Sequence, residues 1–186
     1  HLLKLESRHI LNEHQSIGLT YAVQLDDRKE FDVRRADRSN LPALSLLQWD
    51  QYLGGVHRHF FGHGIQLRTG IQLRLTDNTN SPETGILPLI PDYRAYRAGA
   101  FVIFQQEKKR FLYELGTRYD LNHLQAVVIS TSLPREIERH YHTFHNYSFS
   151  SGVRYRVLPQ LKLNLNAGHV LRSPEVNELY SAGLHQ

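Results

Sequence analysis

The sequence predicts an all-β fold, an antiparallel up-and-down meander of about eight long strands. Three observations predict it: apolar and polar residues alternate along most of the chain, the alternating segments are long, and the connections between them are short and long in turn. A chain of 186 residues has the usual size of one domain, so we expect one β-barrel-type domain over residues 1–186.

The clearest alternation runs from Gly64 to Thr76. Every odd position from Ile65 to Leu75 carries Ile, Leu or Thr, whereas the even positions carry Gln, Arg, Gly or Thr. A helix would place members of the two sets side by side, but a strand separates them onto two faces. The segment is therefore predicted to be a strand.

Seven further segments are strand-like, although some alternate less strictly. They are Leu2 to Ile10, Ser16 to Leu25, Leu44 to Val56, Tyr93 to Gln106, Phe111 to Leu121, Tyr141 to Val157 and Leu161 to Asn166. Several exceed ten residues, which is enough to cross a bilayer at a tilt and longer than the roughly five or six residues of soluble strands.

The connections support the same architecture. Those at Asn12 to His14, His57 to His63, Glu107 to Arg110 and Leu158-Pro159 are short, and those at Asp26 to Leu41, Asp77 to Asp92 and Leu121 to Glu138 are long. Outer-membrane barrels place short turns on the periplasmic side and long loops outside. We therefore expect part of a larger transmembrane β-barrel, which would be an open curved sheet if isolated, with outer-membrane lipid as a partner.

Composition excludes other classes. No apolar run approaches the eighteen or so residues of a membrane helix. The 22 Lys and Arg residues are dispersed among 18 Asp and Glu residues, which does not point to nucleic acid. No strand–elbow–helix or paired-carboxylate pattern organises catalytic side chains, so we expect no enzyme and no cofactor.

Aromatic residues and glycines follow the strands. Phe60, Phe61, Phe111 and Tyr155 lie toward short connections, and Tyr93, Tyr96, Tyr119 and Tyr141 lie toward long ones, as interfacial girdles would. Ordinary core packing would explain each aromatic almost as well. Five strand glycines fall on the polar face, where they would permit bending or close approach: Gly18, Gly70, Gly116, Gly152 and Gly168.

The segment from Leu171 to His185 reads LRSPEVNELYSAGLH. It resembles the Arg-x-Pro … Asn-Glu-Leu-Tyr-Ser-x-Gly-x-His motif of TonB-dependent receptor barrels. The stretches Asn78 to Tyr96 and Gly116 to Asp120 also resemble such receptors, particularly those of Bacteroidetes-like bacteria. The motif residues that we expect to act as a structural loop are Arg172, Pro174, Asn177, Glu178, Leu179, Tyr180 and Gly183. Within the motif we expect an ion pair between Arg172 and Glu178, and a helical turn from Glu175 to Ser181.

The resemblance implies a transporter of about 22 strands with a plugged lumen, of which these eight strands would form a third of the wall. The plug domain and the remaining strands are not recognisable in this chain. The implied location is the outer membrane of a Gram-negative bacterium, and the implied partner is the TonB complex, reached through the missing plug. The implied cargo is a scarce, bulky nutrient such as an iron–siderophore complex, haem or cobalamin.

Twelve histidines prompt a haem or metal hypothesis. His57, His59 and His63 have metal-compatible spacing, but they fall in a predicted turn, where solvation is the favoured interpretation. His140 and His142, with His145 nearby, enter a strand where two of them could face one aqueous cavity, although a solvated loop base is favoured here too. His185 resembles the histidine that follows the Arg-x-Pro box in haem receptors, so it is a candidate cargo contact. We expect no metal site.

Two alternatives remain open at this point. Eight strands can close on themselves, which would give a small self-contained porin or structural barrel. A soluble β-sandwich binding module would instead use the apolar face as its core.

Overall fold

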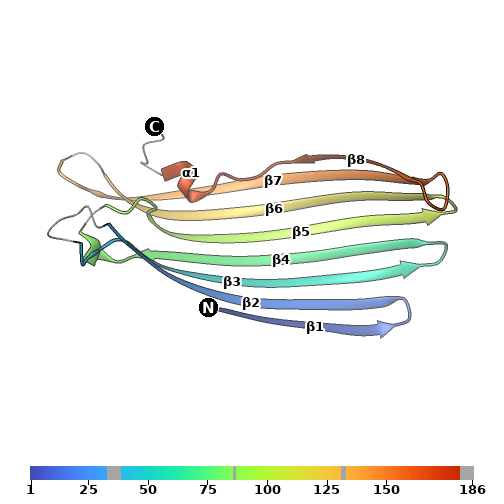
Figure 1. Cartoon of the computed structure of the whole chain (residues 1–186), viewed down its shortest axis with the longest axis horizontal. Coiled ribbons are helices and arrows are strands. Elements are labelled where there is room, and N and C mark those ends of the chain that lie inside the picture. The colour runs from blue at the N-terminus through green and yellow to red at the C-terminus, as the bar shows by residue number, and fades with distance from the viewer. Residues whose placement is uncertain (33–38, 86, 131–132, 181–186) are drawn as a thin grey trace.

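The computed structural model describes residues 1–32, 39–85, 87–130 and 133–180, which form a single antiparallel sheet whose strands follow in chain order (Figure 1). The predicted up-and-down meander is confirmed. The strands are β1 (Leu2–Asn12), β2 (Gln15–Phe31), β3 (Pro42–Phe61), β4 (Ile65–Asn80), β5 (Asp92–Lys108), β6 (Phe111–Ile129), β7 (Ile137–Arg156) and β8 (Lys162–Val170), accompanied by the short helices η2 (Pro82–Thr84) and α1 (Val176–Tyr180).

The short and long connections lie at opposite ends of the sheet, as predicted (Figure 1). The long connections are nevertheless shorter than expected, because β2 continues to Phe31, β4 to Asn80 and β6 to Ile129. The apolar alternation stops earlier than the backbone ladder, since hydrogen bonding between strands does not require an apolar face. Strands β2–β7 have 16–20 residues, which is more than the 9–11 or so that a tilted strand needs to cross a bilayer.

The predicted turn at His57 to His63 is wrong for most of its length. His57 and His59 belong to β3, and only residues 62–64 connect it to β4. Nε2 of His57 lies 3.2 Å from Oε1 of Gln15, and the ring of His59 stacks on Phe61 with 3.9 Å between centroids. These two histidines are therefore strand residues with side-chain contacts, and not members of a solvated turn.

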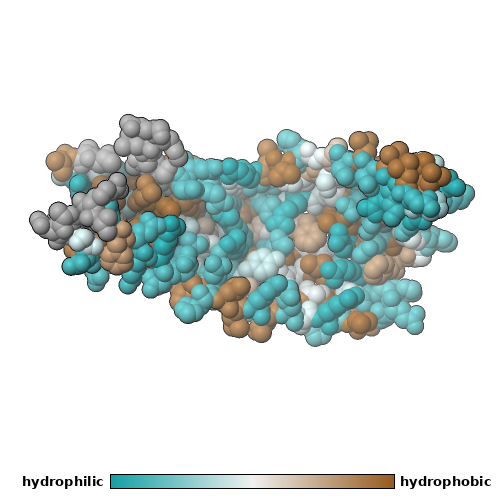
Figure 2. Space-filling view, viewed as in Figure 1, coloured by the Kyte–Doolittle hydropathy of each residue, from teal (hydrophilic) through white to brown (hydrophobic). Residues whose placement is uncertain are grey.

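Strand register divides the side chains into two faces. Tyr52, Arg74 and Arg97 are successive ladder partners on one face, and Leu53, Leu73 and Ala98 are successive partners on the other. We call these the polar face and the apolar face. Hydrophilic side chains predominate on the face toward the viewer in Figure 2.

The apolar face has no covering layer among the described residues. Large side chains on it are exposed in neighbouring strands, including Leu19, Leu53, Ile71, Phe149 and Leu165. A soluble sandwich would bury this face under a second sheet, whereas a barrel wall presents it to lipid. The single sheet therefore fits the barrel prediction and not the sandwich alternative.

The five strand glycines lie on the polar face, as predicted. At Gly70 there is no room for a side chain, because a Cβ there would lie 2.5 Å from the Phe101 ring and 2.8 Å from the carbonyl oxygen of Gly55.

The predicted aromatic girdles are wrong at Phe60 and Tyr93, which pair with Gln66 and Ala126 on the polar face. The girdle pattern came from position along the chain, and it could not assign these two rings to a face.

The sheet is open in the part of the chain that the structure describes. β1 pairs with β2 and β8 pairs with β7, and no ladder joins β1 to β8. The alternative of a closed eight-stranded barrel is therefore not what these strands form. Over the same residues, no helix has the length and apolar character needed to cross a membrane.

Candidate ligand-binding site on the polar face

Residues 171–180 leave β8 and fold back over the polar face near the long-connection end; we call them the folded-back segment. β8 ends at Val170, Pro174 follows, and α1 supplies the predicted helical turn. Val176 is buried against Ala95 of β5 and Leu124 of β6, with Tyr93 and Tyr180 beside them. This small apolar cluster fixes the helix on the sheet.

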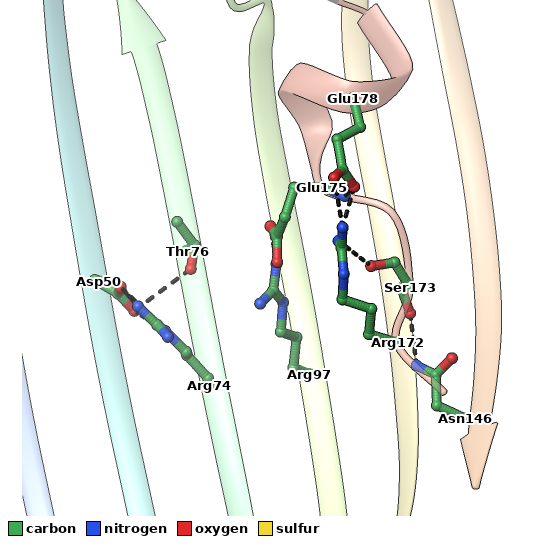
Figure 3. A network of polar contacts seen from close by, with 9 residues as sticks. All are labelled: Asp50, Arg74, Thr76, Arg97, Asn146, Arg172, Ser173, Glu175 and Glu178. Atoms are coloured by element: carbon green, nitrogen blue, oxygen red, sulfur yellow. Dashed lines mark hydrogen bonds and ion pairs between the residues drawn. The ribbon is translucent and has the colours of Figure 1, made fainter. Parts of the chain in front are cut away.

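Three polar contacts add to this docking, and Figure 3 shows the residues of the first two. Nη2 of Arg97 donates to Oε2 of Glu175 at 2.6 Å, and Nδ2 of Asn146 donates to Oγ of Ser173 at 2.6 Å. Nε2 of His142 lies 2.6 Å from the hydroxyl of Tyr180. The folded-back segment is thus tied to both β5 and β7.

The segment is also braced internally by the expected ion pair. Arg172 donates to the two carboxylate oxygens of Glu178 at 2.8 and 2.6 Å, and the backbone N–H of Glu175 donates to the same carboxylate at 2.9 Å. These bonds, chiefly those from Arg172, lower the pKa of Glu178 to about 2, and the carboxylate in turn raises the pKa of Arg172. Partial burial raises the pKa of Tyr180.

Beneath the segment lies a cavity of about 400 Å³, bordered by β3–β7 and by residues 170–175. Four arginines line it: Arg74, Arg97, Arg118 and Arg172. Each has an acidic partner, and Nε of Arg74 donates to Asp50 at 2.8 Å while Nε of Arg118 donates to Asp120 at 2.7 Å. The arginines are therefore held in fixed orientations around the cavity (Figure 3 shows three of them).

Two buried polar atoms in the cavity lining have no hydrogen-bond partner among the described residues. They are Nε of Arg97, a donor, and Oδ1 of Asn122, an acceptor, and the two residues are ladder partners on β5 and β6. Leaving such groups unpaired costs roughly 1–3 kcal/mol each, so proteins seldom retain them without a use. Both atoms are buried within the lining, beneath the surface that faces the cavity.

The candidate histidines are divided between the faces. His140 and His142 share the polar face, with 6.4 Å between ring centroids, whereas His145 lies on the apolar face and its Nδ1 is 2.7 Å from the hydroxyl of Tyr119. No cluster of three or more metal-binding side chains occurs among the described residues. His185 and Gly183 lie outside those residues.

Most of the cavity lining was missed at the level of sequence. The available signal was the polar phase of alternation at the loop-side halves of neighbouring strands, which carries Arg74, Arg97, Arg118, Asp120 and Asn146. Each residue looks ordinary within its own strand. Only the register aligns them across the sheet.

The fold and this site define a class: a wall of an outer-membrane β-barrel with a polar interior face partly covered by a folded-back segment. The family model for the TonB-dependent receptor-like β-barrel matches residues 7–185, so the chain belongs to the TonB-dependent receptor family, as its barrel region. No curated protein matches the chain.

Membership confirms the resemblance seen in the motif. TonB-dependent receptors are outer-membrane receptors and transporters of Gram-negative bacteria, not enzymes, and they work with TonB. In such a barrel the polar face lines the lumen, and the apolar face meets lipid.

Proposed function

We propose that this chain forms part of the barrel wall of a receptor that imports a scarce, bulky nutrient, such as an iron–siderophore complex, haem or cobalamin, with energy from TonB. The remaining strands and the plug domain would lie outside residues 1–186, and TonB would act through that plug. The open edges at β1 and β8 support this arrangement, because further strands can pair with them.

The observation that carries the proposal is the lumenal cavity under the folded-back segment. The cavity lies near the long-connection end of the sheet, which would be extracellular, where cargo arrives before transport. Its volume of about 400 Å³ falls in the range of ligand pockets, and the four oriented arginines that line it provide directional contacts. Contacts of this kind suit a polar or anionic chelate more than an apolar solute.

A growth assay tests the transport function. A host lacking its own receptors would express the full receptor and grow on single sources of iron, as ferric siderophores or haem, or of cobalamin. We expect growth on at least one source, and only in cells with functional TonB. Growth on none of them, with the receptor verified in the outer membrane, contradicts the proposal; so does growth that persists without TonB.

A matched pair of variants tests the cavity. Arg97→Gln removes a lumenal arginine and its bond to Glu175, whereas Arg94→Gln, three residues earlier, removes an arginine on the apolar face that donates to Asp77 at 2.6 Å. Arg97→Gln should weaken cargo binding about tenfold, the effect of losing one charge-assisted hydrogen bond. Arg94→Gln should leave it unchanged, and equal effects would exclude the cavity as the site.

The histidines give a second version of this proposal, specific for haem. His140 and His142 lie together on the polar face beside Tyr180, and imidazole is a haem-iron ligand. For a haem receptor, we propose that His185 and one of these two histidines contact the cargo. His185→Ala and His142→Ala should then each lower haem binding without lowering membrane insertion, and unchanged haem binding in both variants would contradict this version.

A further inference from the structure

The β5–β6 turn carries a basic cluster that the transport function does not use. Lys108, Lys109 and Arg110 are consecutive and exposed, and they form the end of the β5–β6 hairpin. No hydrogen bond or ion pair in the described part of the chain engages the side chains of these three residues. The other short connections, residues 13–14, 62–64 and 157–161, contain no Lys or Arg. The positive charge at this end of the apolar face is therefore concentrated at one hairpin.

Directly beneath the cluster lies a set of three aromatic rings on the apolar face. Phe111 stacks on Tyr155 of β7 with 4.6 Å between centroids and on Tyr113 with 5.7 Å. Together with Lys108, Lys109 and Arg110, these rings border a shallow pocket of about 340 Å³. One pocket thus has cations toward the turn and aromatic rings toward the middle of the sheet.

The nearest acid does not neutralise this cluster. Glu107 alternates with Lys108, so it points to the polar face, where Oε1 lies 3.9 Å from Nη2 of Arg156. Lys109 and Arg110 also border a smaller recess of about 60 Å³ on that face, together with Glu107, Arg154, Arg156 and Lys162. The turn therefore adds positive charge to the rim without an acidic partner on the lipid side.

We propose that this pocket, formed by Lys108, Lys109, Arg110, Phe111, Tyr113 and Tyr155, binds the headgroup of an anionic glycerophospholipid in the periplasmic leaflet of the outer membrane. The proposal rests on the proposed function, because the short-turn end is periplasmic only if the chain is part of an outer-membrane barrel. The cations would pair with the phosphate, and the rings would lie at the level of the glycerol and upper acyl chains. A soluble anion would use the cations but gain nothing from the aromatic half of the pocket.

The test uses the full receptor in neutral-detergent micelles doped with dioleoylphosphatidylglycerol or with dioleoylphosphatidylcholine. A lipid that binds the folded state raises the thermal unfolding midpoint in a concentration-dependent way. We expect phosphatidylglycerol to do so at lower concentration than phosphatidylcholine. The triple variant Lys108→Gln, Lys109→Gln, Arg110→Gln should raise the required phosphatidylglycerol concentration by about ten- to a hundredfold, given the usual contribution of each basic residue near anionic lipid.

Two control variants keep the test decisive. Arg154→Gln, Arg156→Gln, Lys162→Gln removes the same charge at the same end but on the polar face, and it should change the response less than twofold. Lys108→Arg, Lys109→Arg, Arg110→Lys keeps the charge and should retain the response even if the glutamine variant folds poorly.

Several outcomes would overturn the proposal: equal responses to the two lipids, equal losses in the two glutamine variants, or full competition by glycerol 3-phosphate, which would indicate a soluble phosphate site. Stronger binding of lipopolysaccharide than of phosphatidylglycerol would also overturn it, since that lipid occupies the opposite leaflet. If the receptor supports TonB-dependent growth but does not distinguish phosphatidylglycerol from phosphatidylcholine, only this proposal is contradicted. If it distinguishes the two lipids but does not support TonB-dependent growth, only the transport function is contradicted.

Discussion

The middle of the sheet and the folded-back segment reach their structures by different means. In β4, each residue's environment follows from its parity, so Ile71 faces outward because Gly70 and Gln72 face inward. In the folded-back segment, the position of Val176 depends on Ala95 and Leu124, which are 81 and 52 residues earlier in the chain. The wall is determined locally by pattern and ladder, whereas the segment is determined by long-range contacts, so a single substitution should affect the two regions differently.

The largest expected effect is in the wall. Ile71 is 61% exposed on the apolar face and is the seventh residue of β4 from the short-turn end, near the expected midplane of the bilayer. Ile71→Arg should lower the free energy of unfolding of the full receptor in phospholipid vesicles by about 2–4 kcal/mol. Denaturant titration of the reconstituted protein measures this.

The control for this variant is Thr20→Arg, at a similar depth on the polar face of β2. Thr20 pairs with Glu6 of β1, so the new arginine has an acidic neighbour in a wet lumen. Its effect should be below about 1 kcal/mol. Similar losses for the two variants would mean that the apolar face does not contact lipid.

A smaller effect is expected where the folded-back segment docks. Val176 is 6% exposed, and Val176→Ala removes about two buried methyl groups, which should weaken docking by about 1–2 kcal/mol. The stability of the wall should not change, because α1 is not part of any ladder. Limited proteolysis of the full receptor should therefore cut near residues 171–180 faster, with unchanged denaturation of the barrel; coupled loss of both would show that the two regions fold as one.

The contrast between local pattern in the wall and long-range contacts in the segment also explains which features could be predicted from the sequence. Alternation from Ile65 to Leu75 was sufficient to predict a strand and its two faces, because the period of two is a local property. The alternation did not predict the strand at His57 and His59. There β3 continues with polar side chains at positions where an apolar residue would have indicated a strand. Strand ends beyond the apolar alternation are specified by backbone pairing, which leaves little trace in composition.

The candidate site was less predictable than the fold. The ion pair of Arg172 with Glu178 could be expected, because both residues lie in one short motif. The bonds of Arg97 to Glu175 and of Asn146 to Ser173 could not, because they join strands to a segment whose path the pattern does not specify. Register brings the remaining arginines together, and register is a property of the whole sheet.

A still smaller effect is expected at Asn146. Its side-chain amide donates to Ser173, and Asn146→Ala would remove this hydrogen bond while leaving the contact of His142 with Tyr180, which also joins β7 to the folded-back segment. The expected weakening of docking is about 0.5–1.5 kcal/mol. If Asn146→Ala speeds up hydrogen exchange of residues 171–180 as much as Val176→Ala does, the apolar cluster is not the dominant anchor of the segment. The polar contacts would then contribute at least as much to docking as the packing of Val176.

The smallest expected effect is the pH response of Glu178, which appears in the unsubstituted receptor only in acid. The folded-state pKa of about 2 lies below the ordinary value of 4.5, so the ionised carboxylate contributes to the ordered segment fully above about pH 4.5. This contribution is lost as the pH falls toward 2, when protonation breaks the bidentate bond from Arg172. In the full receptor, hydrogen exchange of residues 171–180 should therefore accelerate progressively between pH 4.5 and 2, after correction for the intrinsic exchange rate. Glu178→Gln removes the titrating group, so in that variant this acceleration should be absent and the segment should already exchange faster at pH 7. An unchanged acid profile in Glu178→Gln would show that the acid sensitivity of the segment does not come from Glu178 and its internal ion pair with Arg172.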